Sequence, residues 1–127
     1  KYIAVGTSGN PRVMYSTDGI TWSQTGVTGV PQAEWRSIAY GDGKFVSVDS
    51  GGSNNTMYST DGLTWETSEP TALNSWNDVA YGGAPGQEKF VAVAESGSDR
   101  VMYSTDGITW SNQGITGTPD TCWRSVR

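Results

Sequence analysis

Eight residues of this sequence recur almost unchanged three times. YSTDGITW occupies residues 15–22, YSTDGLTW occupies 58–65, and YSTDGITW returns at 103–110. The copies follow one another at intervals of roughly 44 residues, and self-similarity at such a period is typical of solenoids and propellers. The chain of 127 residues is therefore expected to consist of three similar units.

Each copy contains an Asp-Gly pair flanked by segments in which apolar and polar residues alternate, as in RVMYST-DG-ITWS. The pairs are Asp18-Gly19, Asp61-Gly62 and Asp106-Gly107. Asp-Gly between alternating segments is a strong signal for a two-residue hairpin, because a type I′ turn needs positive φ at both central residues. We therefore expect a β-hairpin with a type I′ turn in each unit.

Two further strands are expected before each hairpin. One begins with Lys and the other with Trp: the Lys strands are 1–6, 44–49 and 89–94, and the Trp strands are 35–41, 76–83 and 123–127. Four antiparallel strands in roughly 44 residues match one blade of a β-propeller. The sequence thus predicts an all-β propeller of four-stranded antiparallel blades, with three blades per chain.

The repeated motif resembles the Asp-box (BNR) repeat of sialidase-like β-propellers, with one residue fewer between Asp and Gly. This resemblance covers the chain three times, and it implies that each motif joins the third and fourth strands of a blade. The Asp side chain is expected to accept hydrogen bonds from turn N–H groups, and the Trp ring to pack between neighbouring sheets. The residues with this structural role are Ser16, Asp18, Gly19, Trp22, Ser59, Asp61, Gly62, Trp65, Ser104, Asp106, Gly107 and Trp110.

The phase of the repeat predicts how the blades are completed. Residues 1–127 form a single module whose blades are 1–26 together with 123–127, then 35–70, then 76–114. Three blades do not close a ring, so we expect a homodimer in which strand 123–127 of each chain completes the N-terminal blade of the other. The six blades that result are also the number in sialidase-type propellers. A trimer of nine blades, and a fragment of a longer gene product, are the alternatives.

Composition excludes several classes of function. The chain carries a formal charge of −5 and no cationic stripe, so we expect no nucleic-acid partner. It has no apolar run of about 20 residues, so no membrane span is expected. It also contains no His, which removes a Ser-His-Asp triad and imidazole metal sites. We expect no catalytic residue, no metal and no cofactor, and none of the sialidase catalytic groups has a counterpart that can be assigned here.

A ligand site is expected where the Trp strands begin. Its candidate residues are Trp35, Arg36, Trp76, Asn77, Trp123 and Arg124. Trp rings suit the C–H faces of sugars, and Arg or Asn side chains suit sugar hydroxyls. The alternative is that these Trp residues belong to the core between blades.

The sequence therefore predicts a protein that is not an enzyme: a binding module with lectin-like recognition of carbohydrate or of a surface, at sites between blades. Two alternatives stay open, a structural or orphan propeller fragment without a ligand and a fragment of an Asp-box glycoside hydrolase. Such repeats also resemble segments of phage and bacterial surface proteins, which makes a secreted or surface location one hypothesis.

Overall fold

A computed structural model describes residues 1–52, 56–119 and 121–127 and contains ten β-strands. The strands are β1 (Tyr2–Val5), β2 (Val13–Ser16), β3 (Trp22–Ser23), β4 (Trp35–Gly41), β5 (Lys44–Asp49), β6 (Thr56–Ser59), β7 (Glu66–Ser68), β8 (Ser75–Gly82), β9 (Lys89–Ser96) and β10 (Val101–Ser104). Within these residues no helix has the length and hydropathy to cross a membrane. The prediction of an all-β chain is confirmed.

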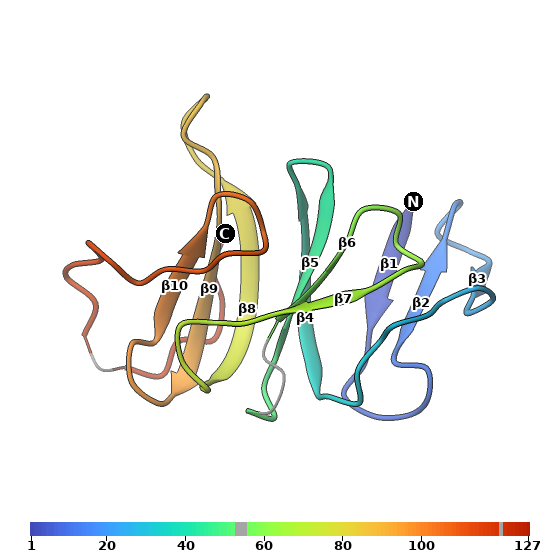
Figure 1. The fold of residues 1–127 in the computed structure, drawn as a ribbon, viewed down its shortest axis with the longest axis horizontal. Coiled ribbons are helices and arrows are strands. Elements are labelled where there is room, and N and C mark those ends of the chain that lie inside the picture. The colour runs from blue at the N-terminus through green and yellow to red at the C-terminus, as the bar shows by residue number, and fades with distance from the viewer. Residues whose placement is uncertain (53–55, 120) are drawn as a thin grey trace.

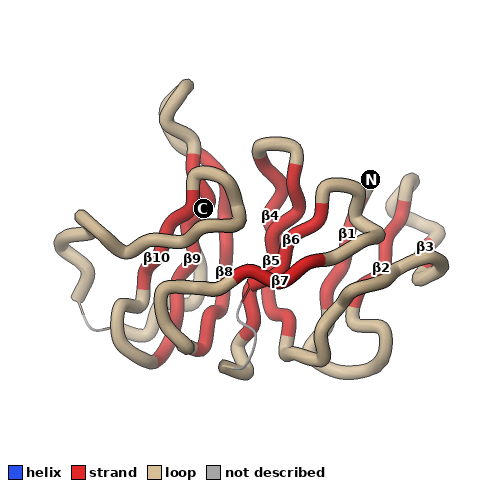
Figure 2. The backbone as a smooth tube through the Cα atoms, viewed as in Figure 1, coloured by secondary structure: helices blue, strands red, loops and turns tan. Residues whose placement is uncertain are grey.

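The strands form three antiparallel sheets that follow one another along the long axis of the molecule (Figure 1). The N-terminal sheet has the order β1-β2-β3, the middle sheet β4-β5-β6-β7, and the C-terminal sheet β8-β9-β10. Each is a meander in which strands adjacent in sequence are adjacent in space, and the described parts of the connections are loops and turns (Figure 2). The chain therefore runs through its three repeats from one end of the molecule to the other.

Most predicted strands lie where the repeat predicts them, but the last two strands expected along the chain differ. The fourth strand of the C-terminal sheet is reduced to one bridge between Tyr103 and Ser111. Residues 123–127, expected to be a strand, form none in this structure. The Trp123 N–H donates to the carbonyl of Ala94 at 3.1 Å, which holds the segment beside the C-terminal sheet. Among the described residues no strand pairs with 123–127 in a ladder.

The hairpins of the repeated motif are present, but their turns are not type I′. In the first hairpin Ser16 lies opposite Trp22, which leaves the five residues 17–21 in the loop. Gly19 has φ 80°, whereas Asp18 is not among the described non-glycine residues with positive φ. The expectation was wrong because the Asp side chain here bonds to the two N–H groups that follow Gly19, which requires a longer loop.

A two-residue turn with positive φ at both residues occurs elsewhere, between β4 and β5. Asp42 has φ 46° and Gly43 has φ 72°, and the flanking residues Gly41 and Lys44 are paired. These are the requirements of a type I′ hairpin. The Asp-Gly signal was therefore valid in this chain, but at a pair that the repeat motif does not contain.

Two hydrophobic cores lie between the sheets. The first joins the N-terminal and middle sheets around Val13, Ala33, Trp35, Met57 and Trp65. The second joins the middle and C-terminal sheets around Val46, Val48, Trp76, Val79, Phe90, Ala92, Ala94, Met102 and Trp110. Each sheet thus has two different faces: a Met-Trp face directed at the preceding sheet and a Val-rich face directed at the following sheet.

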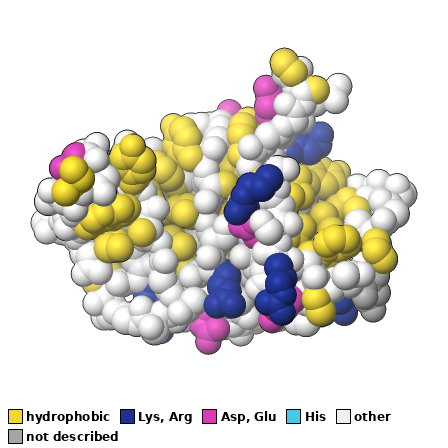
Figure 3. Space-filling view, turned by 180° about the vertical axis from the view of Figure 1, so that it is seen from behind, with side chains coloured by type: hydrophobic (Ala, Val, Ile, Leu, Met, Phe, Trp, Pro, Cys, Tyr) yellow, Lys and Arg dark blue, Asp and Glu magenta, His cyan; other side chains and the backbone are white. Residues whose placement is uncertain are grey.

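The N-terminal sheet has no sheet before it to cover its Met-Trp face. Met14 and Trp22 are 38% and 39% exposed, whereas their repeat counterparts Met57 and Trp65 are 0% and 2% exposed. Figure 3 shows hydrophobic side chains at both ends of the molecule and a group of basic side chains near its middle. The N-terminal end of this three-sheet stack is therefore an apolar surface of the kind that is buried inside it.

Candidate functional site

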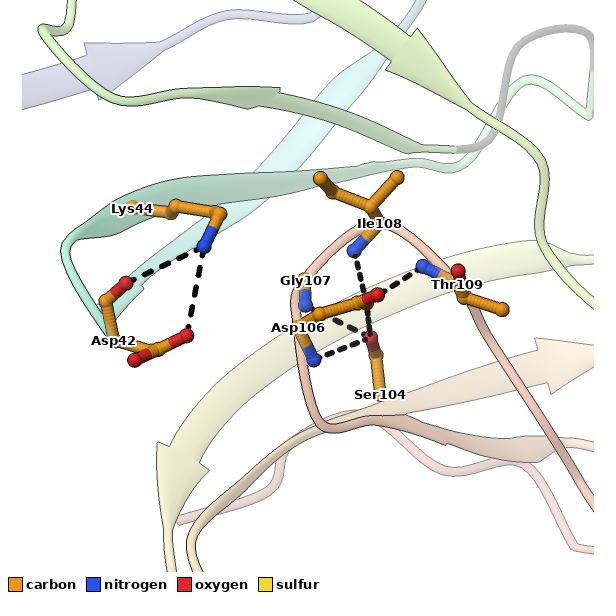
Figure 4. Close-up of polar contacts among 7 residues, drawn as sticks. All are labelled: Asp42, Lys44, Ser104, Asp106, Gly107, Ile108 and Thr109. Carbon is orange, nitrogen blue, oxygen red and sulfur yellow. Dashed lines mark hydrogen bonds and ion pairs between the residues drawn. The ribbon is translucent and has the colours of Figure 1, made fainter.

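The turns of the repeated motif are closed by two side chains, as the third copy shows (Figure 4). The Ser104 hydroxyl oxygen accepts from the Gly107 N–H at 2.8 Å and donates to the Asp106 carboxylate at 2.9 Å. Asp106 Oδ1 also accepts from the N–H groups of Ile108 and Thr109, at 2.8 and 2.7 Å. The other two copies make the same bonds within 0.1 Å.

These bonds hold the turn carboxylates in the ionised state. Hydrogen bonds from the N–H groups of Thr21 and Ile20 lower the pKa of Asp18 to about 2, and those of Thr64 and Leu63 do the same for Asp61. Burial alone would raise the pKa of Asp106, but the corresponding bonds outweigh it and the pKa falls. A general acid needs a pKa near the working pH, so these groups suit a structural role.

Two of the predicted ligand-binding tryptophans lie inside the cores. Trp35 and Trp76 are 1% and 0% exposed, and their indole N–H groups donate to the carbonyls of Pro31 and Ala72 at 3.1 and 3.2 Å. Both rings therefore belong to the core between sheets, which was the alternative to ligand binding. Neither ring has an exposed face on which a sugar could stack. Trp123 remains partly exposed beside the C-terminal sheet.

The polar partners of those tryptophans occupy β-bulges. In β4 the register shifts between Trp35 and Ser37, so Arg36 is the unpaired residue, and in β8 Asn77 is unpaired for the same reason. The Asn77 amide donates to Glu95 Oε2 at 3.2 Å and to the carbonyl of Trp123 at 3.1 Å. The structure thus brings Asn77 into contact with the C-terminal segment.

Arg124 joins that contact through the same carboxylate. Its guanidinium lies 3.7 Å from Glu95 Oε2, and its side chain is largely exposed, as is Arg36. Arg36, Asn77 and Arg124, here called the polar row, occupy corresponding positions of the repeat; the two arginines are exposed, whereas Asn77 is 9% exposed. The row offers hydrogen-bond donors to a ligand, but its buried tryptophans offer no stacking surface.

Asp78 links three segments at this edge. Its Oδ1 accepts from the hydroxyl of Ser37 at 2.5 Å, and its Oδ2 accepts from the Ser125 hydroxyl and the Val126 N–H at 2.9 and 3.0 Å. Arg127 forms an ion pair with the same oxygen at 2.5 Å. Burial raises the pKa of Asp78, but these donors together outweigh it, so the pKa lies below its ordinary value.

A groove between the N-terminal and middle sheets has the features of a small-ligand site. It has a volume of about 400 Å³ and is lined by Lys1, Tyr40, Phe45, Thr60 and Asp61. The Tyr40 side chain is 60% exposed and rests on Phe45 with 4.7 Å between ring centroids. The Lys1 ammonium crosses the groove and donates to the Asp61 carbonyl at 2.7 Å.

Sequence reasoning missed this groove, although a signal for it was present. Ala-Tyr-Gly ends two strands of the repeat, at 39–41 and 80–82. In the second copy Tyr81 lies on Phe90 with the same 4.7 Å centroid distance, but its ring is less exposed because it packs against Gly41. Lys44, the counterpart of Lys1, bonds instead to Asp42 (Figure 4). The open groove is therefore a property of the first intersheet junction.

No family model, curated protein or solved structure matches this chain. The resemblance of its motif to the Asp-box therefore remains a prediction. Among the described residues, no group of three or more His, Cys, Asp or Glu side chains is placed to hold a metal ion.

Proposed function

We propose that this chain is a non-catalytic β-propeller module that binds carbohydrate in grooves between its blades. The observation that carries the proposal is the groove at Tyr40, where an exposed aromatic ring lies beside charged and hydroxyl groups at a junction of two sheets. Its volume of about 400 Å³ falls in the range usual for small-molecule sites.

The chemistry of the groove suits a sugar ring. The open face of Tyr40 provides an apolar plane for the C–H face of a pyranose, and Phe45 beneath it fixes the plane. The Thr60 hydroxyl can donate and accept, the Lys1 ammonium donates, and the Asp61 carboxylate accepts. Because the pKa of Asp61 is about 2, that carboxylate stays an acceptor at every physiological pH. Stacking on one side and mixed hydrogen bonding on the other is the pattern of carbohydrate recognition.

The fold proposed with this function is a ring of six blades made by two chains. Each sheet is one blade, and strand exchange through 123–127 supplies the strand that the N-terminal sheet lacks. This proposal is supported by the exposed Met14 and Trp22 of the N-terminal sheet, whose counterparts Met57 and Trp65 are buried between sheets. A ring of two chains carries at least two copies of the Tyr40 groove, so a ligand presented on a surface would be held with avidity.

The test is binding of a panel of soluble oligosaccharides, followed by NMR or calorimetry. Tyr40→Ala is expected to weaken binding at least about tenfold through loss of stacking, while Tyr40→Phe keeps most of the affinity. Arg36→Ala decides between the groove and the polar row, because it should leave binding in the groove unchanged. An unchanged affinity in Tyr40→Ala with a loss in Arg36→Ala would move the site to the polar row. Absence of binding across the panel would favour the structural alternative.

A further inference from the structure

A cavity on the N-terminal sheet lies where the other sheets hold a tryptophan. It has a volume of about 180 Å³, and its lining includes Ala4, Gly6 and Met14. In the C-terminal sheet the repeat counterparts of these residues are Ala92, Ala94 and Met102, which share a buried core cluster with the indole of Trp76. The N-terminal sheet therefore has the lining of a tryptophan pocket without a tryptophan.

The same sheet has an open backbone edge next to that cavity. The counterparts of β1 in the other two sheets are β5 and β9, and each pairs on this edge with a strand that contains a Trp near its start, β4 or β8. Among the described residues no strand pairs with this edge of β1. An unpaired edge is a template for strand addition.

A segment of the chain repeats the sequence that fills these places in the middle sheet. Residues 115–127 read ITGTPDTCWRSVR, and residues 27–39 read VTGVPQAEWRSIA. The segment 27–39 ends in β4 of the middle sheet, and two of its contacts with the rest of that sheet are used here. It buries Trp35 in the first core, and Thr28 exchanges hydrogen bonds with the carbonyl of Leu63 and the N–H of Trp65, at 2.9 and 3.0 Å.

We infer that residues 115–119 and 123–127, here called the arm, dock on the N-terminal sheet of a second copy as 27–39 docks on the middle sheet. The pairing of β4 with β5 sets the register, in which Trp35 lies opposite Asp49 and Ser37 opposite Val48. By the repeat, Trp123 lies opposite Gly6 of the second copy and Ser125 opposite its Val5. The indole of Trp123 fills the cavity, and Thr116 bonds to the backbone on either side of Thr21. This inference rests on the two-chain ring of the proposed function.

Two features of the single chain point to this occupant. The buried indole nitrogen of Trp123 has no hydrogen-bond partner among the described residues, whereas Trp35 and Trp76 donate to carbonyls four residues earlier. Ile20 and Trp22, the counterparts of the residues that Thr28 covers, are 85% and 39% exposed. The indole nitrogen of Trp123 thus lacks a partner in the single chain, and the receiving surface is uncovered. In a two-fold dimer each chain docks its arm on the other, so both contacts form together.

A pair of glycines provides a matched test of the arm. An added Cβ at Gly29 would lie 2.2 Å from the Trp65 carbonyl oxygen, while at its counterpart Gly117 it would meet nothing within 4 Å in the single chain. Gly117→Ala should therefore clash only when the arm docks. Gly114→Ala is the control, because Gly114 has nearly the same φ (76° against 74°) and its counterpart Gly26 has no neighbour within 4 Å.

The measurement is light scattering after size exclusion on the full 127-residue chain. The unchanged chain and Gly114→Ala should both have about twice the chain mass of 13.6 kDa, and Gly117→Ala should have the mass of one chain. Met14→Arg, which fills the cavity with a charged side chain, should also be monomeric, while Leu73→Arg, at an exposed apolar residue elsewhere, should stay dimeric. Trp123→Ala should weaken each of the two interfaces about 100-fold or more.

The decisive experiment mixes the two variants that are expected to be monomeric. Met14→Arg keeps an intact arm and Gly117→Ala keeps an intact cavity, so the two monomeric variants together should form a one-to-one heterodimer through a single interface. Failure to form it, or a monomeric unchanged chain, would overturn the inference. A ladder of masses would overturn the two-fold closure. Dimers that persist in Met14→Arg and Gly117→Ala would overturn the docking. Oligosaccharide binding at Tyr40 is measured separately on each species, so its loss would count against the proposed ligand and not against the arm.

Discussion

Substitution of Asp78 by Asn tests whether one carboxylate holds three segments together. The change keeps the size of the side chain but replaces one acceptor oxygen by an amide nitrogen that only donates. In one orientation the amide nitrogen faces the N–H of Val126 and the guanidinium of Arg127, and in the other it faces the hydroxyl of Ser37, which already accepts from the N–H of Val79 at 3.4 Å. Neither orientation of the new side chain satisfies every donor that the Asp78 carboxylate satisfies.

The expected loss of stability follows from those partners. The Val126 N–H is part-buried, and a polar group left unsatisfied there costs about 1–3 kcal/mol. The Arg127 side chain is 77% exposed, so water replaces its partner and the ion pair adds about 0–1 kcal/mol. Together these terms predict a free energy of unfolding lower by about 1–4 kcal/mol. With a urea m-value of about 2 kcal/mol/M, the midpoint of unfolding should fall by roughly 0.5–2 M.

The assay is urea unfolding followed by tryptophan fluorescence, with Asp42→Asn as the control. Asp42 is exposed at a turn with φ 46°, a conformation that Asn adopts as readily as Asp, and its ion pair with Lys44 at 3.5 Å is exposed. The control should therefore change the free energy of unfolding by less than about 0.5 kcal/mol. An Asp78→Asn variant as stable as the control would refute the reasoning, because it would mean that the carboxylate bonds have no net effect.

Three further predictions concern the repeats. Gly41→Ala should lower the free energy of unfolding by about 1–3 kcal/mol and the thermal midpoint by several degrees, because its Cβ would lie 2.0 Å from the Tyr81 ring. Gly82→Ala is the control and should have little effect, since a Cβ there would have no neighbour within 4 Å. Met57→Ala should cost about 2–5 kcal/mol in urea unfolding, and Met14→Ala clearly less when both are measured as monomers, since Met57 alone is fully buried. Stability should also depend on pH, because Asp18 and Asp61 have a pKa of about 2 in the folded chain, below the ordinary 3.8. Their contribution to the free energy of unfolding is therefore present above about pH 4 and is lost as the pH falls towards 2. Calorimetry at a series of pH values would show this loss. Equal effects within either matched pair, or a midpoint that stays constant below pH 4, would contradict the corresponding argument.

The strands of this fold could be predicted from the sequence because their alternation is local. The segments 35–41 and 44–49 have the same bounds in the structure as in the prediction. Strand 123–127 could not be judged in the same way, since a strand exists only where another offers it an edge. Its sequence matches β4, but in the single chain it forms no ladder, and the open edge of β1 belongs to the N-terminal sheet at the other end of the stack.

The turns show a different limit of sequence reasoning. The Asp-Gly dipeptide predicts positive φ at both residues, but the Ser two residues before each motif Asp changes the outcome. Ser16 and Asp18 bond to each other and to the loop N–H groups, which selects a five-residue loop. Where no such Ser precedes the pair, at Asp42 and Gly43, the two-residue turn forms.

The candidate site was harder to predict because burial depends on neighbours far away in the sequence. A Trp at the start of the first strand of a sheet fits a stacking platform and a core residue equally well, and only the position of the preceding sheet decides between them. Trp35 and Trp76 are covered by that sheet. Tyr40 lies near the end of β4 and stays 60% exposed. Its counterpart Tyr81 packs closely against Gly41 of the preceding sheet.

The distribution of indoles along the stack also gives the protein an optical property. Of the six tryptophans, four lie in the two cores, and the two others, Trp22 and Trp123, lie at opposite ends. Core indoles emit at short wavelength and are shielded from dissolved quenchers, whereas Trp22, which is 39% exposed, emits further to the red and is quenched. Any event that covers the N-terminal end changes only this red, quenchable fraction. The intrinsic emission spectrum of the unlabelled chain therefore reports on the state of its N-terminal end, separately from the state of its cores.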